Sequence, residues 1–176
     1  MTHVTHTFGP WFDEQSRVLV LGTMPSPKSR EDGFYYAHRQ NRFWRVLPAL
    51  YGLPPLVGDI EGQKRFLTEH HIALWDVLES CDINGASDAS IRNPVPNDMN
   101  VILSRAPIRA IFATGTKAGS LYRRLCLPMC GREAVTLPST SPANCAVSFD
   151  RLCEQYAVIR QTAECNTERL GGNNEQ

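Results

Sequence analysis

The chain has 176 residues, of which 42% are hydrophobic and 20% charged, and its formal net charge is zero. This length predicts one domain with a sizeable core, and the composition excludes a mainly disordered chain. No apolar run approaches the roughly 18 residues that a transmembrane helix needs. The N-terminus also lacks the charged start and following apolar stretch that are typical of a secretory signal. We therefore expect a cytoplasmic protein whose six cysteines are reduced thiols rather than disulfides or metal ligands.

Short apolar runs alternate with segments of helical periodicity in the first half of the chain. Residues 17–22 predict a buried strand that ends in Gly22 and leads into a polar loop over 23–40. Apolar residues at helical spacing predict helices over 41–51, where Asn41 is a candidate N-cap, and over 59–71.

The same alternation continues in the second half. A strand over 72–78 precedes a long loop over 79–96 that is rich in Gly, Asn, Asp and Ser. The remaining expected elements are a helix over 97–106, a strand over 108–114, a helix over 116–127, a strand over 134–137 and a helix over 148–161. Strands that alternate with helices predict an α/β fold with a mostly parallel sheet and helices on both faces.

Four unusual loops follow the predicted strands. Because ligands bind at the carboxyl ends of parallel strands, these loops are expected to meet at one functional edge. They are Gly22-Thr-Met-Pro-Ser26, residues 79–96, Thr114-Gly115 and Pro138-Ser-Thr-Ser-Pro142.

Basic residues are concentrated in two segments of this neutral chain. Residues 17–45 carry six basic and two acidic residues, whereas residues 99–132 carry six basic and none acidic. The two segments form one positive face if the fold brings them together, and two separate solvated surfaces if it does not.

Four motifs over nearly the whole chain form a distinctive combination, although none is specific alone. They are Gly22-Thr-Met-Pro-Ser26-x-x-Ser29, Tyr35-Tyr36-Ala-His38-x-x-Asn41-x-Phe43-Trp44, Trp75-Asp-Val-Leu-x-Ser-Cys81 with Gly85 and Asp88, and Leu137-Pro-Ser-Thr-Ser-Pro-Ala-Asn144. This combination resembles the uracil-DNA glycosylase superfamily, and most closely its branch of hypoxanthine-DNA (deoxyinosine) glycosylases.

The resemblance implies a three-layer α/β/α sandwich around a short, mostly parallel four-stranded sheet. It implies a single domain over residues 1–165, followed by a flexible tail over 166–176. The implied activity is a monomeric DNA glycosylase that flips a deaminated base, hypoxanthine first, out of DNA and hydrolyses its N-glycosidic bond without a metal or cofactor. A uracil or other deaminated-base glycosylase is one alternative, and a catalytically weak nucleic-acid-binding relative is another.

The resemblance also assigns roles to residues. Asn41 is the expected catalytic residue, which positions water or the flipped base, and a plain N-cap is its alternative role. Phe43 is expected to stack on the base and Tyr36 to wall the pocket. The full base pocket is Gly22, Thr23, Met24, Pro25, Tyr36, Phe43, Asp88 and Thr114. The expected DNA-backbone contacts are Ser26, Ser29, Ser139, Thr140, Ser141 and Asn144.

Five positions depart from the pattern that the resemblance implies, and two of them are Ile83, where relatives tend to have Arg, and Ala86, where they tend to have Ser. Met24 stands where most members have an Asp or Asn that orients the attacking water, which matches the hypoxanthine branch. Leu137 stands in place of a His that stabilises the departing base, and Thr114 in place of an Asn. We therefore expect a slow enzyme, in which Asp88 accepts a hydrogen bond from a base N–H.

Overall fold

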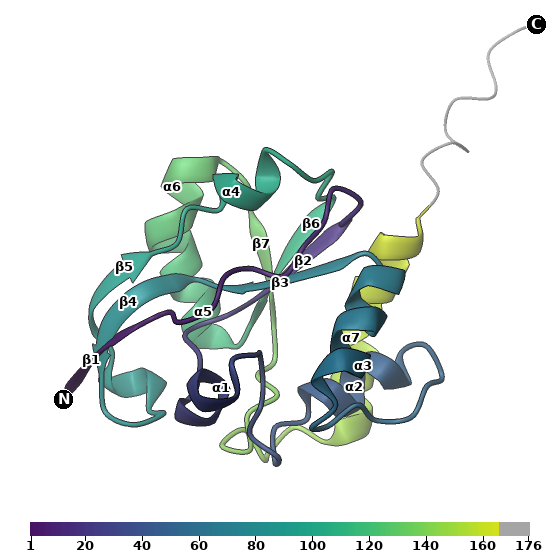
Figure 1. Ribbon diagram of the computed structural model, residues 1–176, viewed down its shortest axis with the longest axis horizontal. Helices are drawn as coiled ribbons and strands as arrows, with labels where there is room; N and C mark the ends of the chain where they lie inside the picture. The colour runs from purple at the N-terminus through teal and green to yellow at the C-terminus, as the bar shows by residue number, and fades with distance from the viewer. Residues whose placement is uncertain (166–176) are drawn as a thin grey trace, which may run out of the picture.

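Four parallel strands form the centre of the structure, a computed structural model that describes residues 1–165 (Figure 1). The strands are β2 (Val18–Gly22), β3 (Ile72–Asp76), β6 (Ala110–Thr114) and β7 (Ala134–Leu137), in the spatial order β3-β2-β6-β7. Every residue of β2 and β3 is buried. This burial is typical of the continuous apolar runs of a parallel sheet that is covered on both faces. All four predicted strands of this sheet are confirmed.

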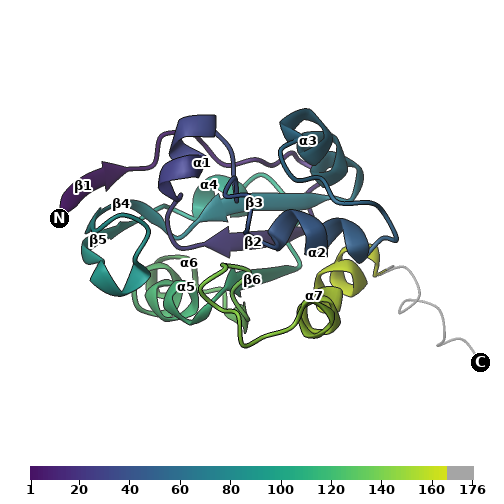
Figure 2. The same ribbon diagram turned by 90° about the horizontal axis from the view of Figure 1, so that it is seen from below.

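Helices cover both faces of the parallel sheet, so the predicted three-layer α/β/α arrangement is confirmed. Figure 2 shows α1 (Pro27–Asp32) and α3 (Ile60–Glu69) on one side, and α5 (Thr116–Leu121), α6 (Leu127–Cys130) and α7 (Phe149–Glu164) on the other. Helix α2 (Phe43–Ala49) packs against α7, and α4 (Asn100–Leu103) precedes β6. A π-helical turn over Tyr122–Cys126 joins α5 to α6. The predicted tail at 166–176 lies outside the described residues.

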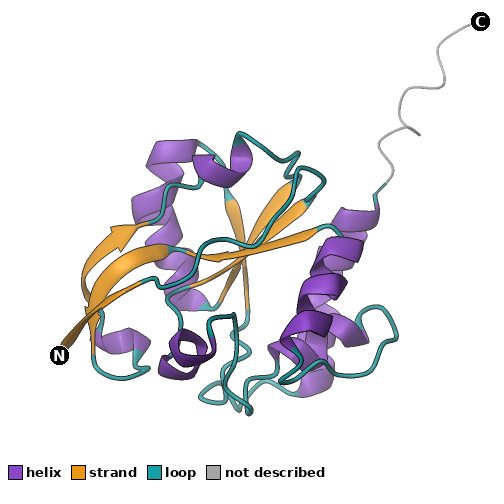
Figure 3. Ribbon diagram, in the orientation of Figure 1, coloured by secondary structure: helices purple, strands orange, loops and turns teal. Residues whose placement is uncertain are grey.

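A second sheet of three antiparallel strands lies beside the first and was not predicted (Figure 3). It consists of β1 (Thr2–Thr5), β4 (Leu78–Ile83) and β5 (Arg92–Pro96), with β4 in the middle. The prediction of one loop over 79–96 is therefore wrong. Two prolines made β5 look like a loop, but β5 is an edge strand, where proline is tolerated.

The predicted loop over 23–40 is also partly helical. Ser26 caps α1 by accepting a hydrogen bond from the Ser29 backbone N–H, and Pro27 follows at the first helical position. A capping serine before a proline is a helix-start signal. The helix is short enough that apolar periodicity could not reveal it.

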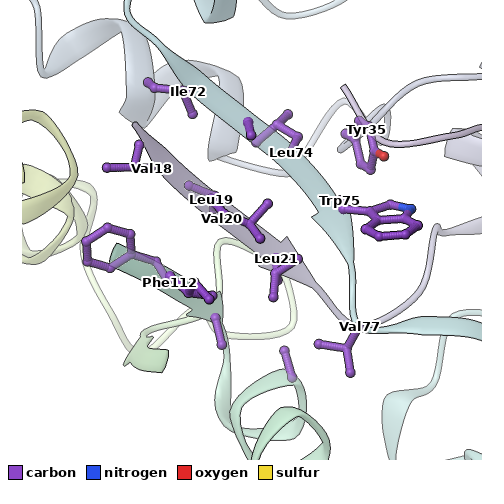
Figure 4. Packing of buried hydrophobic residues seen from close by; sticks show 14 of the residues in the cluster. Val18, Leu19, Val20, Leu21, Tyr35, Ile72, Leu74, Trp75, Val77 and Phe112 are labelled. Carbon is purple, nitrogen blue, oxygen red and sulfur yellow. The ribbon is translucent and has the colours of Figure 1, made fainter. Parts of the chain in front are cut away.

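The core lies between the two sheets and the helices that flank them. Leu19, Leu21, Leu74, Phe112 and Val77 are buried in one cluster, and Figure 4 shows their side chains around β2 and β3. Val77 lies where β3 passes directly into β4, so the two sheets share one continuous stretch of chain. This passage fixes the carboxyl end of β3, where the candidate site lies.

Two of the basic residues, at the amino ends of β2 and β6, form hydrogen bonds with the end of α7. Arg17 precedes β2, and its guanidinium donates to the Ala163 carbonyl at 3.1 Å. Arg109 precedes β6 and donates to the carbonyls of Thr162 and Cys165. Cations beside the last carbonyls of a helix are favoured electrostatically, so these arginines stabilise the end of α7.

Candidate active site

A cavity of about 870 Å³ opens at the carboxyl edge of the parallel sheet. Its walls include the last residues of three strands, Gly22, Asp76 and Thr114, and Pro138, which follows β7. The volume falls in the usual range for small-ligand sites, and the position is where α/β sheets bind ligands. Residues from all four segments predicted as loops line the cavity, although the segment over 79–96 consists mainly of β4 and β5 and contributes only Ile83 and residues 85–88.

The cavity gathers every predicted site residue except Phe43. Those that line it are Gly22, Thr23, Met24, Pro25, Ser26, Ser29, Tyr36, Asn41, Asp88, Thr114, Ser139, Thr140, Ser141 and Asn144. Phe43 is fully buried, and the Tyr36 ring stacks on it with the centroids 3.8 Å apart and the planes 13° apart. The expectation that Phe43 stacks on a ligand does not fit this arrangement, because Tyr36 covers it. Both Tyr35 and Tyr36 line the cavity, and Tyr36 is the more exposed of the two.

Tyr36 is held in place at both its backbone and its hydroxyl. Its φ of 52° lies in the left-handed region, which a bulky side chain rarely adopts. Its hydroxyl donates to Thr114 Oγ1 at 3.0 Å, since the Thr114 proton is directed to the Leu21 carbonyl at 3.1 Å. Burial raises the pKa of Tyr36 well above its usual value, and the nearby charge of Asp76 raises it further. The hydroxyl of Thr114 is thus engaged with the Tyr36 hydroxyl and the Leu21 carbonyl, and Thr114 lines the cavity as expected.

The amide of Asn41 has a defined orientation. Its Oδ1 accepts hydrogen bonds from the Phe43 backbone N–H at 2.9 Å and from the Thr140 hydroxyl at 2.8 Å. A backbone N–H can only donate, so Oδ1 and Nδ2 cannot be exchanged. Nδ2 makes no hydrogen bond within residues 1–165, and Asn41 lines the cavity. Asn41 thus accepts the first N–H of α2, although Arg42 rather than Asn41 occupies the N-cap position. The two Nδ2 protons of Asn41 remain available to a ligand.

The loop after β7 is bonded to the residues around Asn41. The Arg42 backbone N–H donates to the Thr140 carbonyl at 3.0 Å. The Arg42 guanidinium donates to the carbonyls of Asn144, at 2.9 Å, and Val147. Asn144 Nδ2 donates to the Ser139 carbonyl at 2.9 Å, which tightens the loop itself. The loop and the start of α2 therefore form one rigid wall of the cavity.

Two of the expected phosphate-binding side chains are used inside the protein instead. Thr140 is 1% exposed and its hydroxyl bonds to Asn41, as described. Ser29 is 2% exposed, and its hydroxyl oxygen accepts hydrogen bonds from the Ala37 backbone N–H and the Ser26 hydroxyl, each at 3.1 Å. A direct contact of these two side chains with phosphate does not fit their burial. Ser139 and Ser141 remain partly exposed on the loop.

The floor of the cavity is acidic. Asp76 accepts a hydrogen bond from His6 Nε2 at 2.8 Å, and these two side chains are 5% and 4% exposed. Asp88 lines the cavity from an exposed turn, and its Oδ2 accepts a hydrogen bond from the Thr23 hydroxyl at 3.2 Å. Burial of this carboxyl raises the pKa of Asp88, and the charge of Asp76 raises it further, against the lowering effect of the Thr23 bond.

Sequence reasoning gave no role to Asp76 or His6. Asp76 had a signal, because it is the charged residue that ends the otherwise apolar run 72–75. His6 had no such signal, since nothing in the sequence brings residue 6 to residue 76.

Within residues 1–165, no group of three or more His, Cys, Asp or Glu side chains could hold a metal ion. In the same part of the chain, no helix is long and apolar enough to span a bilayer.

The fold and the cavity define a class: an α/β/α protein with a cavity lined by polar and tyrosine side chains at the carboxyl edge of its parallel sheet. Comparison with known families narrows this class. The model of the uracil DNA glycosylase superfamily matches residues 10–161, and the chain belongs to this superfamily.

Individual relatives agree with the family. The chain is 35% identical over 151 residues to a hypoxanthine DNA glycosylase of Methanosarcina acetivorans, covering 84% of this chain and 93% of the relative. It is 30% identical over 138 residues to a hypoxanthine DNA glycosylase of Methanosarcina barkeri, covering 78% and 86%. A solution NMR structure of a candidate uracil DNA glycosylase from M. acetivorans superposes with a TM-score of 0.77 at 32% identity, covering 92% of this chain and 99% of that one.

Proposed function

We propose that this DNA glycosylase removes hypoxanthine from DNA, acting through Asn41. The observation that carries the proposal is the fixed amide of Asn41, a cavity-lining residue whose Oδ1 has both acceptor positions occupied and whose Nδ2 has no partner within residues 1–165. The names of the relatives from the two Methanosarcina species support hypoxanthine as the base. The superfamily membership supports DNA as the substrate.

In the proposed mechanism, the base leaves the duplex and lies against the Tyr36 ring. Extrusion of a base costs a few kcal/mol and is easiest for a mispaired one, which contributes to selection of damage. An Asn41 N–H donates to an acceptor atom of the base. As the bond between the sugar C1′ and the base nitrogen breaks, negative charge develops on the base and this hydrogen bond strengthens. Water then adds to C1′ and loses a proton, the departing base takes up a proton from solvent, and the products are an abasic site and the neutral base.

The residues present favour stabilisation of the leaving base over activation of water. Met24 cannot orient water by hydrogen bonding, and Leu137 cannot donate to the base. Glycosidic cleavage passes through an oxocarbenium-like state, which needs stabilised charge more than a strong nucleophile. Removing one such donor typically slows an enzyme by about 10²–10³-fold, so we expect a slow but active enzyme.

Ser139 and Ser141 are proposed to contact the DNA backbone beside the flipped nucleotide, as hydroxyls and loop N–H groups commonly bind phosphate oxygens. We also propose that the protein acts as a monomer in the cytoplasm. Six free cysteines suit a reducing compartment. Light scattering during size-exclusion chromatography would test the monomer.

The test is single-turnover excision from labelled duplexes that carry hypoxanthine, uracil, xanthine or adenine at one position, followed by alkaline strand cleavage. We expect cleavage at hypoxanthine in preference to adenine. Asn41→Ala should lower the hypoxanthine rate by about 10²–10³-fold while DNA affinity stays within a few-fold. Asn100→Ala is the matched control, because Asn100 is exposed and lies outside the cavity.

The alternatives predict different results. Cleavage at uracil with none at hypoxanthine would replace the proposed base. Binding of DNA without cleavage at any base would instead identify a relative that has lost catalysis. An Asn41→Ala variant with the wild-type rate would refute the role of Asn41.

A further inference from the structure

Two hydrogen bonds hold the backbone on either side of Tyr36, and the mechanism above assigns them no role. The indole Nε1 of Trp44, on α2, donates to the Tyr35 carbonyl at 2.8 Å. The Ser29 hydroxyl, on α1, accepts a hydrogen bond from the Ala37 backbone N–H at 3.1 Å. Trp44 is 1% exposed and Ser29 is 2% exposed, so both side chains are withdrawn from solvent. Tyr36 is therefore held between two helices.

These two bonds fix a backbone conformation that a tyrosine disfavours. A peptide group is planar, so the chain turns at Tyr36 only through the φ and ψ angles of this residue. One bond holds the peptide group before Tyr36, and the other holds the peptide group after it. Together they set both angles, including the left-handed φ of 52°. Such a conformation persists only where the surrounding structure enforces it, and it is concentrated at functional sites.

This conformation decides where the Tyr36 ring lies. Tyr36 lines the cavity, stacks on Phe43 with the ring centroids 3.8 Å apart and bonds through its hydroxyl to Thr114. A change of φ toward the extended region would turn the Cα–Cβ bond, and the ring with it, away from this position. The stacking and the hydroxyl bond restrain the ring itself, but they do not fix the backbone that carries it.

We infer that Trp44 and Ser29 are positioning residues, which hold the two peptide groups of Tyr36 and so keep its ring where a flipped base can lie against it. The inference rests on the proposed base-excision function and gives these two buried side chains a role in the reaction. Both act through Tyr36 rather than through contact with the base. Because a misplacement of about 1 Å can slow a reaction by about 100-fold, loss of either bond should be measurable.

The first experiment measures single-turnover excision of hypoxanthine by Trp44→Phe and Ser29→Ala, each alone and combined with Tyr36→Ala. Trp44→Phe keeps a buried ring without the N–H donor, and Ser29→Ala removes the acceptor for the Ala37 N–H. We expect each variant alone to slow excision by about 10- to 100-fold. In the Tyr36→Ala background neither should cause a further loss, because the ring to be positioned is gone. A general structural effect would instead add to the loss.

The second experiment observes the ring without DNA, by fluorine NMR of protein that contains 3-fluorotyrosine. Loss of one signal in Tyr36→Phe identifies the Tyr36 resonance. The ring current of Phe43 shifts this resonance in the wild-type protein, because the two rings are stacked. Trp44→Phe and Ser29→Ala should move the resonance toward the frequency of an unstacked tyrosine.

Two control variants remove similar groups from positions that do not line the cavity. Ser16→Ala removes a hydroxyl that is also 2% exposed and also accepts a backbone N–H, that of Asp13 at 3.0 Å. Trp11→Phe removes an indole N–H that has no hydrogen-bond partner within the described residues. Both variants should keep the wild-type excision rate and the wild-type Tyr36 resonance.

Each outcome decides between the proposals. An unchanged rate and an unchanged Tyr36 resonance in Trp44→Phe and Ser29→Ala would overturn the inference and leave the proposed function intact. Losses that add to the loss of Tyr36→Ala would do the same. No excision of hypoxanthine by the wild-type protein would overturn the proposed function, while the fluorine signal would still show whether the two residues position the ring. If Trp44→Phe does not fold by circular dichroism, Ser29→Ala tests the inference through the same two measurements.

Discussion

Thr140 lies in the loop that was expected to bind phosphate, but its hydroxyl donates a hydrogen bond to Asn41, the proposed catalytic residue. Its hydroxyl is withdrawn from solvent and occupies the second acceptor position of Asn41 Oδ1. This bond, with the one from Phe43, prevents the Asn41 amide from rotating. A small misplacement of a reacting group can lower a rate by about 100-fold, so we regard Thr140 as a positioning residue for Asn41.

Thr140→Val removes the hydroxyl and keeps the shape of the side chain, whereas Thr140→Ser keeps the hydroxyl. We expect the valine variant to excise hypoxanthine about 10- to 100-fold more slowly in single turnover, with DNA affinity unchanged, and the serine variant to remain near wild type. Combining Thr140→Val with Asn41→Ala should cause no further loss, because the residue to be positioned is gone. Additive losses in the double variant would contradict this role.

The partly buried carboxylate of Asp88, which lies near Asp76, is expected to lower the stability of the folded protein when it is ionised. Burial raises the pKa of Asp88, so the folded state favours its neutral form and ionisation weakens folding. The neutral Asp88 carboxyl therefore contributes fully to the free energy of unfolding below the pKa that Asp88 has in the unfolded chain. This contribution is lost as the pH rises through the pKa of Asp88 in the folded protein.

Asp88→Asn stays neutral at every pH and can still accept the Thr23 hydrogen bond. We expect its Tm to exceed that of the wild-type protein near neutral pH, and the difference to shrink as the pH falls toward about 4. Thermal unfolding across this pH range measures the difference. A gain in Tm accompanied by slower excision would show that the charge is retained for function, whereas no gain at neutral pH would contradict the expectation.

At the scale of elements, the wall made by α2 and the loop over 138–147 depends on one arginine. The Arg42 guanidinium bridges two carbonyls of the loop, those of Asn144 and Val147. A planar guanidinium spans two acceptors in a fixed geometry, which a lysine ammonium does not reproduce. The loop is otherwise linked to α2 by the Thr140 contacts described above.

Arg42→Met should therefore release the loop, and Arg42→Lys should not restore it. We expect faster amide hydrogen exchange over residues 139–147 in both variants, with little change in the central strands. Excision should slow in parallel, since Thr140 moves with the loop. Arg45→Met is a comparison on the same helix, because Arg45 donates to the carbonyls of Arg39 and Asn41 rather than to this loop. Unchanged exchange in Arg42→Met would refute the bridging role.

The elements differ in how far the sequence could predict them. β2 and β3 were predictable because continuous apolar runs indicate strands that are buried on both faces. β4 and β5 were not, since they have mixed burial and prolines, and their pairing depends on partners far away in the chain. The relative placement of Phe43 and Tyr36 could not be predicted for a similar reason. Local sequence places both near the site, but only the packing of a loop residue in a left-handed conformation decides which ring faces the cavity.

At the scale of the whole molecule, the basic residues of segments 17–45 and 99–132 have two kinds of role. Some form hydrogen bonds inside the fold, and others adjoin the cavity. Arg17 and Arg109 hold the end of α7, at the amino ends of the strands and away from the cavity. Arg39 and Lys117 adjoin the cavity-lining residues His38 and Thr116, one from each segment. Neither side chain makes a hydrogen bond or ion pair within residues 1–165. We therefore expect these two side chains to provide a small positive rim beside the cavity.

This division predicts how DNA binding responds to salt. Each phosphate contact adds about 0.9 to the slope of log affinity against log salt concentration, so Arg39→Gln and Lys117→Gln should each make the slope shallower by about that amount. Because phosphate contacts carry no sequence information, affinity should fall equally for hypoxanthine-containing and undamaged duplexes. Arg105→Gln, on the connection that leads to the amino end of β6, should leave the slope unchanged. Fluorescence anisotropy titrations between about 50 and 200 mM salt give these slopes. A slope that responds to Arg105 and not to Arg39 or Lys117 would place the DNA on another face and separate it from the cavity.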